Sequence, residues 1–269
     1  MHKLWKFVLT ACGLLALVRL AAAAPPPEPA SQTASETRSV DTRVMRVQLD
    51  GAVDLRIRQG SAAMLVLTGD PRWLARLTVH QSGDTINIGG VGGGVGGNIN
   101  MRGFRLTQDP VRAELVLPRL REVVSEGLGT TEISGFSGDE LALALDGAGA
   151  MNANVNYRFV RASLGGVGSM RLAGLQSERI ELDLHGAGQI TLAGQSKSLK
   201  AELSGLGGLD ARQFALDNVW LDLSGLGNAT VTVNGSANLN LSGLGSVTVY
   251  GKPLNRKVSV DGLGKVSWR

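Results

Sequence analysis

Apolar and polar residues alternate along most of the chain, with the period of two residues that is typical of β-strands rather than helices. The alternation is clearest on either side of a short phrase in which one apolar residue stands between two glycines. It runs through residues 219–224 before Gly225 and through residues 228–233 after Gly227. The pattern predicts a unit made of a strand, a Gly-apolar-Gly corner, a second strand and a looser return segment.

The Gly-apolar-Gly phrase occurs eight times at a nearly even interval. The copies begin at Gly127, Gly147, Gly166, Gly186, Gly205, Gly225, Gly243 and Gly262. A fixed period of about 20 residues indicates a stacked array, in which each unit buries apolar surface only against its neighbours. Because all copies run in the same direction, we expect an all-β fold. It would be a parallel β-helix (β-solenoid) with eight regular coils of about 19–20 residues over residues 119–269.

Three aliphatic columns emerge when the copies are superposed on their first glycine, and we expect all three to face the interior. Two positions before that glycine stand Ser125, Leu145, Leu164, Leu184, Leu203, Leu223, Leu241 and Val260. Between the two glycines stand Leu128, Ala148, Val167, Ala187, Leu206, Leu226, Leu244 and Leu263. Four positions after the first glycine stand Thr131, Met151, Met170, Ile190, Leu209, Ala229, Val247 and Val266. Trp268 falls at the C-terminal edge, where it is expected to plug the core.

The segment before the repeats, residues 43–118, has strand-like stretches but no Gly-apolar-Gly corner. Strands are expected at residues 44–49, 53–57, 63–67, 77–80, 85–88 and 111–117, with a short helix at residues 71–76. The offset from Gly51 to Gly127 equals four repeat periods. We therefore interpret this part as irregular β-coils that begin and cap one domain, residues 43–269. Seven glycines between Gly89 and Gly97 favour a loop there.

Residues 1–23 are typical of a secretory signal peptide. Lys3 and Lys6 precede an apolar run from Phe7 to Val18, which is too short to span a bilayer comfortably. Cys12, the only cysteine, ends a phrase that resembles a lipoprotein cleavage box. Lipid anchoring through Cys12 and an uncleaved anchor therefore stay open beside ordinary secretion. Residues 24–42, rich in Pro, Ser and Thr, are expected to form a linker without regular structure.

The charge and the cysteine content argue against several classes of function. The formal net charge is +4, but removal of residues 1–23 takes away Lys3, Lys6 and Arg19 and leaves 24 basic against 23 acidic residues. No basic stripe is present, so a nucleic-acid partner is not expected. Without Cys12 the exported chain would have no disulfide and no thiolate chemistry. We expect a protein of the periplasm, the cell surface or the extracellular space, with no membrane span after cleavage.

Three stretches resemble a known bacterial family. They are residues 53–60 (VDLRIRQG), residues 115–120 (LVLPRL) and the repeated Ser-Gly-Leu-Gly. In these features the chain, from about Arg43 to Arg269, is similar to the family called putative auto-transporter adhesin, head GIN domain. The resemblance implies a right-handed β-helix that is exported to the envelope or cell surface. It brings no catalytic residues to this sequence.

One outward column carries the candidate chemistry. Asp183, Glu202 and Asp222 stand three positions before the first glycine of consecutive copies, so their Cβ atoms are expected about 5 Å apart. Stacked carboxylates suit a hard cation such as Ca²⁺ or a basic partner; alternatively, Lys200 and water screen them. Trp220 is expected beside them, either as a platform for a sugar ring or packed against Lys200. No metal site or cofactor is predicted.

We expect a non-enzymatic, adhesin-like envelope or cell-surface protein that binds a polymer or protein partner, such as a glycan, along its outer face. Neither His80 nor His185 belongs to a recognisable catalytic set. Two alternatives stay open, because fold alone does not choose among them: a polysaccharide lyase or hydrolase, and a purely structural periplasmic module. Exposed strand edges at the solenoid ends also permit a homo-oligomer.

Overall fold

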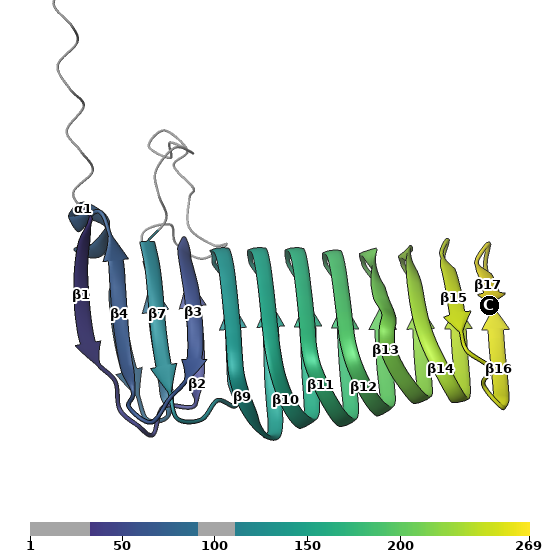
Figure 1. Ribbon diagram of the computed structural model, residues 1–269. Helices are drawn as coiled ribbons and strands as arrows, with labels where there is room; N and C mark the ends of the chain where they lie inside the picture. Colours follow the sequence, from purple (N-terminus) through teal and green to yellow (C-terminus); the bar gives the residue numbers. More distant parts are fainter. Residues whose placement is uncertain (1–32, 91–110) are drawn as a thin grey trace, which may run out of the picture. The chain divides into compact units, whose positions relative to one another are not determined.

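The computed structural model describes residues 33–90 and 111–269, and it confirms the parallel β-solenoid (Figure 1). Six long strands each make one coil: β9 (Leu128–Leu145), β10 (Ala148–Leu164), β11 (Val167–Leu184), β12 (Ala187–Leu203), β13 (Leu206–Leu223) and β14 (Leu226–Leu241). Strands β15 (Ser246–Tyr250) and β16 (Asn255–Val260) share the next coil, and β17 (Lys265–Trp268) follows the last corner. The eight predicted corners thus bound about seven turns.

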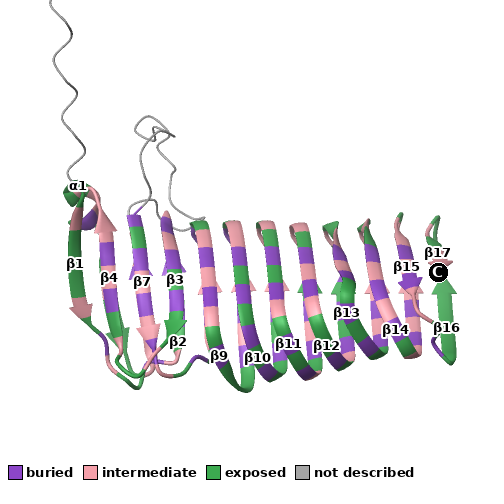
Figure 2. Ribbon diagram, viewed as in Figure 1, coloured by how far each residue is buried: buried purple, intermediate pink, exposed green. Residues whose placement is uncertain are grey.

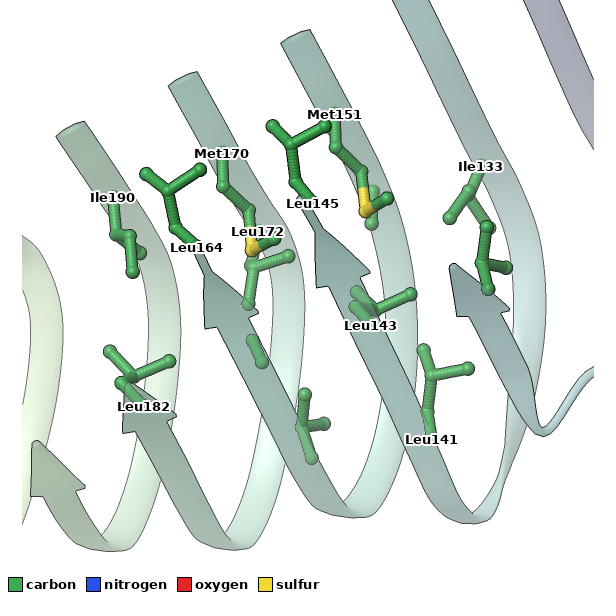
Figure 3. Close-up of a cluster of buried hydrophobic side chains, with 14 of the residues drawn as sticks. Ile133, Leu141, Leu143, Leu145, Met151, Leu164, Met170, Leu172, Leu182 and Ile190 are labelled. Atoms are coloured by element: carbon green, nitrogen blue, oxygen red, sulfur yellow. The ribbon is translucent and has the colours of Figure 1, made fainter. Parts of the chain in front are cut away.

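Each long strand pairs in parallel with the strands before and after it, residue over equivalent residue. In β9 to β14, Leu128, Ala148, Val167, Ala187, Leu206 and Leu226 follow one another as Cα partners. The coil climbs in a right-handed sense (Figures 1 and 3). The predicted looser return differs from the structure, because the strand continues around it and only shifts register locally, as between Thr191 and Ala193.

The interior is filled by the first and third predicted columns. Apart from Val260 and Val266 in the last coil, all their members are at most 5% exposed. Figure 3 shows Leu145 and Leu164 pointing inward beside Met151 and Met170. Trp268 is partly buried against this core at its C-terminal edge, as predicted, and Val260 is 42% exposed because no further coil covers it.

The second predicted column is wrong: the residues between the glycines face outward. Leu206, Leu226 and Leu244 are 51–57% exposed, whereas the residues three positions away on either side are buried. Figure 2 shows how buried and exposed positions alternate along the long strands. The physical reason is that alternation continues unbroken through the corner. Leu223, Gly225, Gly227 and Ala229 take the inward positions, so Leu226 must point out. These two corner positions must be glycine because a Cβ at Gly225 or Gly227 would meet the backbone of the previous corner.

The N-terminal part contains shorter elements. They are β1 (Ala34–Ser39), β2 (Arg46–Asp50), β3 (Val53–Gln59), β4 (Met64–Gly69), α1 (Pro71–Leu74), β5 (Thr78–Ser82), β6 (Thr85–Gly89), β7 (Val111–Leu117) and β8 (Glu122–Ser125). Apart from β1 and β8, the strands and the helix correspond to those predicted. Asp70 caps α1 by accepting a hydrogen bond from the backbone N–H of Arg72, and Pro71 begins the helix.

Strands β2 and β3 together form a coil that lies against β8 and β9, with partners four repeat periods apart in the sequence, such as Arg46 and Glu122. The other side of that coil pairs with β6 and β7. Antiparallel strands close this end of the solenoid: β4 pairs with β7, β1 with β4, and β5 with β6. The irregular capping part is therefore confirmed, and it accounts for the offset between Gly51 and Gly127.

The predicted linker, residues 24–42, needs a correction at its C-terminal end. Residues 34–39 form strand β1, which pairs along its whole length with β4. Its polar composition is compatible with an edge strand that leaves most side chains in water. The signal peptide, Cys12 and most of the linker lie outside the described residues, as does the glycine-rich stretch beyond Gly90. Within the part of the chain that is described, no helix is long and apolar enough to cross a membrane.

Candidate functional site: outward ladders on the solenoid

The predicted carboxylates lie on one outward column of three successive coils. Asp183 of β11 is the Cα partner of Glu202 in β12, and Glu202 is the partner of Asp222 in β13. Parallel pairing in this register stacks their side chains on the outer surface, where the side chains of Asp183 and Glu202 are half exposed. We call these three residues the acidic ladder. The column continues with Asn240, which is uncharged.

Basic groups stand beside two members of the acidic ladder. Lys200 Nζ lies 2.8 Å from Glu202 Oε1, and this hydrogen bond raises the pKa of Lys200. His185 Nδ1 lies 3.4 Å from Asp183 Oδ1. Among the described residues, Asp222 has no ion-pair partner. Lys200 therefore offsets part of the repulsion within the ladder, as one of the two interpretations of the sequence anticipated.

Trp220 lies next to the ladder, on the outward column two residues earlier in the strand. Lys200 is its Cα partner on the neighbouring coil, and the Lys200 Nζ sits 5.1 Å from the centroid of the indole ring. The lysine thus contacts both Trp220 and Glu202 and joins the aromatic and acidic columns. On the two preceding coils this column holds Glu181 and Arg161, whose side chains pair at 3.1 Å. The outer surface that carries these two columns is consequently polar, with charges of both signs and one aromatic side chain, Trp220.

Sequence reasoning missed a second ladder. The residues between the corner glycines form a continuous outward aliphatic column, which we call the aliphatic ridge: Leu128, Ala148, Val167, Ala187, Leu206, Leu226, Leu244 and Leu263. Six of these are large side chains with exposed fractions of 46–86%. A contiguous patch of exposed apolar residues is often an interaction surface. The sequence could have revealed this ridge, because side chains alternate between the inner and outer faces of a strand, and counting from the buried columns places these residues outside.

The ridge borders a shallow depression of about 540 Å³. Its floor is glycine backbone from four successive corners, and its walls are Ala187, Leu206, Leu226, Leu244, His185 and two serines. The serines are Ser204 and Ser224, one position before the first glycine. The depression is a surface feature without an enclosing loop, and its lining offers small polar and aliphatic contacts.

Within residues 33–90 and 111–269, no group of three or more His, Cys, Asp or Glu side chains is placed to hold a metal ion. His80 of β5 and His185, in the corner between β11 and β12, are both exposed and lie in separate parts of the fold. The arrangement therefore offers contacts along a surface: stacked carboxylates, an indole with a lysine above it, and an aliphatic ridge.

A known protein family matches most of the solenoid domain. A family model described as "Putative auto-transporter adhesin, head GIN domain" matches residues 45–253. A search of curated proteins finds no match.

Several solved structures share the fold. A "putative adhesin" from Parabacteroides merdae is 16% identical, with a TM-score of 0.75 over 89% of this chain and 97% of that one. A "putative adhesin" from Bacteroides fragilis is also 16% identical, with a TM-score of 0.64 over 90% and 99% of the two chains. A "putative lipid binding protein" from Parabacteroides distasonis is 18% identical, with a TM-score of 0.72 over 86% and 96%. These similarities concern the fold.

Proposed function

Because the chain belongs to the family described as "Putative auto-transporter adhesin, head GIN domain", we propose that it is a non-enzymatic, adhesin-like protein of the cell envelope or surface. It would be exported by the signal peptide of residues 1–23. Its task would be to bind an extended partner, a glycan or a cell-surface protein, along the outside of the solenoid. Lipid attachment at Cys12 is the less favoured way to hold it at the envelope.

One observation carries this proposal: beside the corners, outward side chains repeat in register from one coil to the next. Parallel pairing places the acidic ladder on a rigid, fully packed core, with one carboxylate per coil at about 4.8 Å spacing. Such a surface suits a partner that is itself extended, because successive units of the partner can meet successive coils. An enclosed small-molecule site would instead need walls, and the depression beside the ridge is open.

The binding groups would be the acidic ladder and Trp220. Asp183, Glu202 and Asp222 would accept hydrogen bonds from sugar hydroxyls or pair with basic groups of a protein partner. Trp220 would add apolar stacking area, with Lys200 holding the indole in place from the neighbouring coil. Asp222, which has no ion-pair partner among the described residues, is the member best able to accept a new contact.

The test is binding of the purified chain to a glycan array and to whole bacterial and host cells, with and without Ca²⁺. We expect saturable binding, weakened about thirtyfold by Trp220→Ala and about tenfold by Asp222→Asn. Asp217→Asn is the matched control, because Asp217 is an exposed acid on the same strand β13 outside the ladder. Its binding should equal that of the unaltered chain.

Three outcomes would overturn the proposal. Absence of binding to every glycan and cell type would favour a structural periplasmic module. Turnover of a polysaccharide that is lost in Asp222→Asn would favour an enzyme. Equal losses in Asp222→Asn and Asp217→Asn would show that general acidity, and not the ladder, governs binding.

A further inference from the structure

The aliphatic ridge is the feature that the proposed function leaves unused. We infer that the ridge is a self-association surface, on which two copies of this chain pack against each other in antiparallel orientation about a two-fold axis. The inference does not depend on the binding role of the acidic ladder. It follows from the chemistry of the ridge, the pattern of side-chain sizes along it and the area available.

The centre of the ridge is apolar, and its borders carry no Asp, Glu, Lys or Arg on the five central coils; the charged residues Glu126, Asp146, Asp261 and Lys265 lie beside its two ends. The column just before the first glycine holds Gly165, His185, Ser204, Ser224 and Ser242 on the five central coils. The column just after the second glycine holds Ser169, Gln189, Gly208, Asn228 and Ser246. An apolar centre that is depleted of Asp, Glu and Lys, with a polar rim, is the composition of a protein–protein interface. Helices and patches that bind anionic membranes carry Lys or Arg around the apolar centre instead.

Side-chain size changes along the ridge in a way that is self-complementary. After Leu128 the first half contains Ala148, Val167 and Ala187, whereas the last four members are all leucine. In an antiparallel pair with full overlap, Ala148 of one copy meets Leu244 of the other. Likewise Val167 meets Leu226, and Ala187 meets Leu206; only the end pair, Leu128 with Leu263, sets leucine on leucine. A parallel pair would set leucine on leucine and alanine on alanine, which leaves crowding in one half and voids in the other.

The depression supports the same arrangement. It spans the corners from Ala187 to Leu244, and its floor is glycine backbone. In the antiparallel pair this stretch faces the residues from Leu206 back to Ala148 of the second copy, so the Leu206 and Val167 side chains of that copy would enter it. A two-fold axis makes every such contact occur twice, as in other isologous dimers.

The contact area of the ridge indicates how strongly two copies would bind. Eight corners at about 4.8 Å spacing give a ridge about 34 Å long, and three outward columns give a width of about 13 Å. The product, about 450 Å² per copy, is below the roughly 800 Å² per partner of a standard stable interface. We therefore expect a weak dimer with a dissociation constant in the micromolar range. A dimer would also carry two acidic ladders, and this would raise the avidity for a repeating partner.

The first test is sedimentation equilibrium of the full chain from low-micromolar to near-millimolar concentration. We expect a monomer–dimer equilibrium that Leu206→Ser and Leu226→Ser each weaken about tenfold or more. Leu254→Ser is the matched control, since Leu254 is 87% exposed and lies away from the ridge. Circular dichroism melting of each variant confirms folding, which is expected because the altered leucines are half exposed. A chain that stays monomeric throughout, or a dimer that Leu206→Ser leaves intact, would overturn the inference.

The second test fixes the orientation by disulfide trapping in a Cys12→Ser background. Ala148→Cys and Leu244→Cys chains, one of them tagged, are oxidised separately and as a mixture. The antiparallel pair predicts a cross-linked dimer containing one chain of each kind, formed only in the mixture. Cross-linking of each variant with itself would indicate parallel packing and contradict the inference. Pelleting of the monomeric chain with neutral phosphatidylcholine vesicles, lost in Leu206→Ser, would assign the ridge to lipid instead and also overturn it.

Discussion

In the regular coils, segments that follow one another along the chain also lie on successive turns of the solenoid. In the N-terminal part, chain order and spatial order differ: the coil made by β2 and β3 lies between the turn that contains β6 and β7 and the turn that contains β8 and β9 (Figure 1). The regular coils have one long strand per turn and purely parallel pairing, whereas the N-terminal part adds the antiparallel strands β1, β4 and β5.

The contrast shows how a solenoid is propagated and how it is closed. Propagation needs only a corner that stacks on the previous corner and an aliphatic filling. At the N-terminal end the sheet finishes in strands that reverse direction, and the outermost, β1, is short and polar, which suits an edge that faces water. The N-terminal part also carries exposed Arg–Glu pairs between turns, such as Arg56 to Glu132 at 2.8 Å. Pairs of this kind contribute little, so packing rather than charge stabilises both regions.

The largest effect is expected from a charge placed in the core of the open C-terminal end. Leu241 of β14 is 1% exposed and lies beneath the last coils. Leu241→Asp buries an unpaired carboxylate and should destabilise this region by about 4 kcal/mol or more. Because coils of a solenoid interact mainly with their neighbours, residues 242–269 should unfold while the N-terminal part persists. Limited proteolysis with mass spectrometry, alongside thermal melting, measures this.

The neighbouring outward position provides the control. Asn240→Asp extends the acidic ladder by one residue beyond Asp222 and should cost only about 0.5 kcal/mol through like-charge repulsion. If the two variants lost the same melting temperature, the inward and outward register of β14 would be wrong.

This register is the part of the fold that the sequence predicted best, and also the place where it misled. The glycine spacing and the alternation around Leu223 and Ala229 were sufficient for the solenoid, its parallel stacking and two of the three core columns. Leu226 was predicted to lie inside because it is aliphatic, although the alternation of side chains along the strand places it outside. Hydrophobicity and alternation usually agree; they disagree here because glycines occupy the inward positions of the corner. The acidic ladder was predicted correctly as a stack because its members follow the alternation.

A smaller effect is expected from a Cβ at a regular corner. Gly207 has a φ of +144°, and a Cβ there would collide with the backbone carbonyl of Gly188 on the preceding coil. Gly207→Ala should therefore cost about 3 kcal/mol, since backbone on both coils must move. Gly83, in the turn between β5 and β6 of the N-terminal part, has a φ of +61° and open space around it. Gly83→Ala should cost only about 1 kcal/mol, the strain of the left-handed conformation.

Chemical denaturation of the two alanine variants measures the difference between the regions. A loss for Gly83→Ala as large as that for Gly207→Ala would mean that φ alone, and not the stacking of corners, demands glycine. The arrangement of the N-terminal part was beyond sequence reasoning for a related reason. Its contacts join residues far apart in the sequence, and no local pattern shows that β2 stacks on both β6 and β8. Strand β1 was missed because its polar composition is that of a linker.

The smallest effect concerns the junction of the two regions. Tyr157 of β10 is buried, and its hydroxyl donates a hydrogen bond of 2.8 Å to the backbone carbonyl of Leu120, between β7 and β8. Tyr157 thereby ties the regular coils to the N-terminal part. Tyr157→Phe leaves that carbonyl without its phenol donor and should cost about 1 kcal/mol at neutral pH. Urea unfolding measures this, and Tyr250→Phe at the C-terminal end is the control for loss of a phenol.

The junction should also be sensitive to alkali. Burial raises the pKa of Tyr157 to about 12, above its ordinary value of 10.0, because it disfavours the phenolate. A folded-state pKa that is raised contributes stability below pH 10, and this contribution is lost as the pH rises from 10 to about 12. The gap in unfolding free energy between the unaltered chain and Tyr157→Phe should therefore be constant up to pH 10 and shrink above it. A gap that stays constant through pH 12 would mean that the phenol ionises as readily in the folded chain as in the unfolded one, which would contradict the raised pKa of Tyr157.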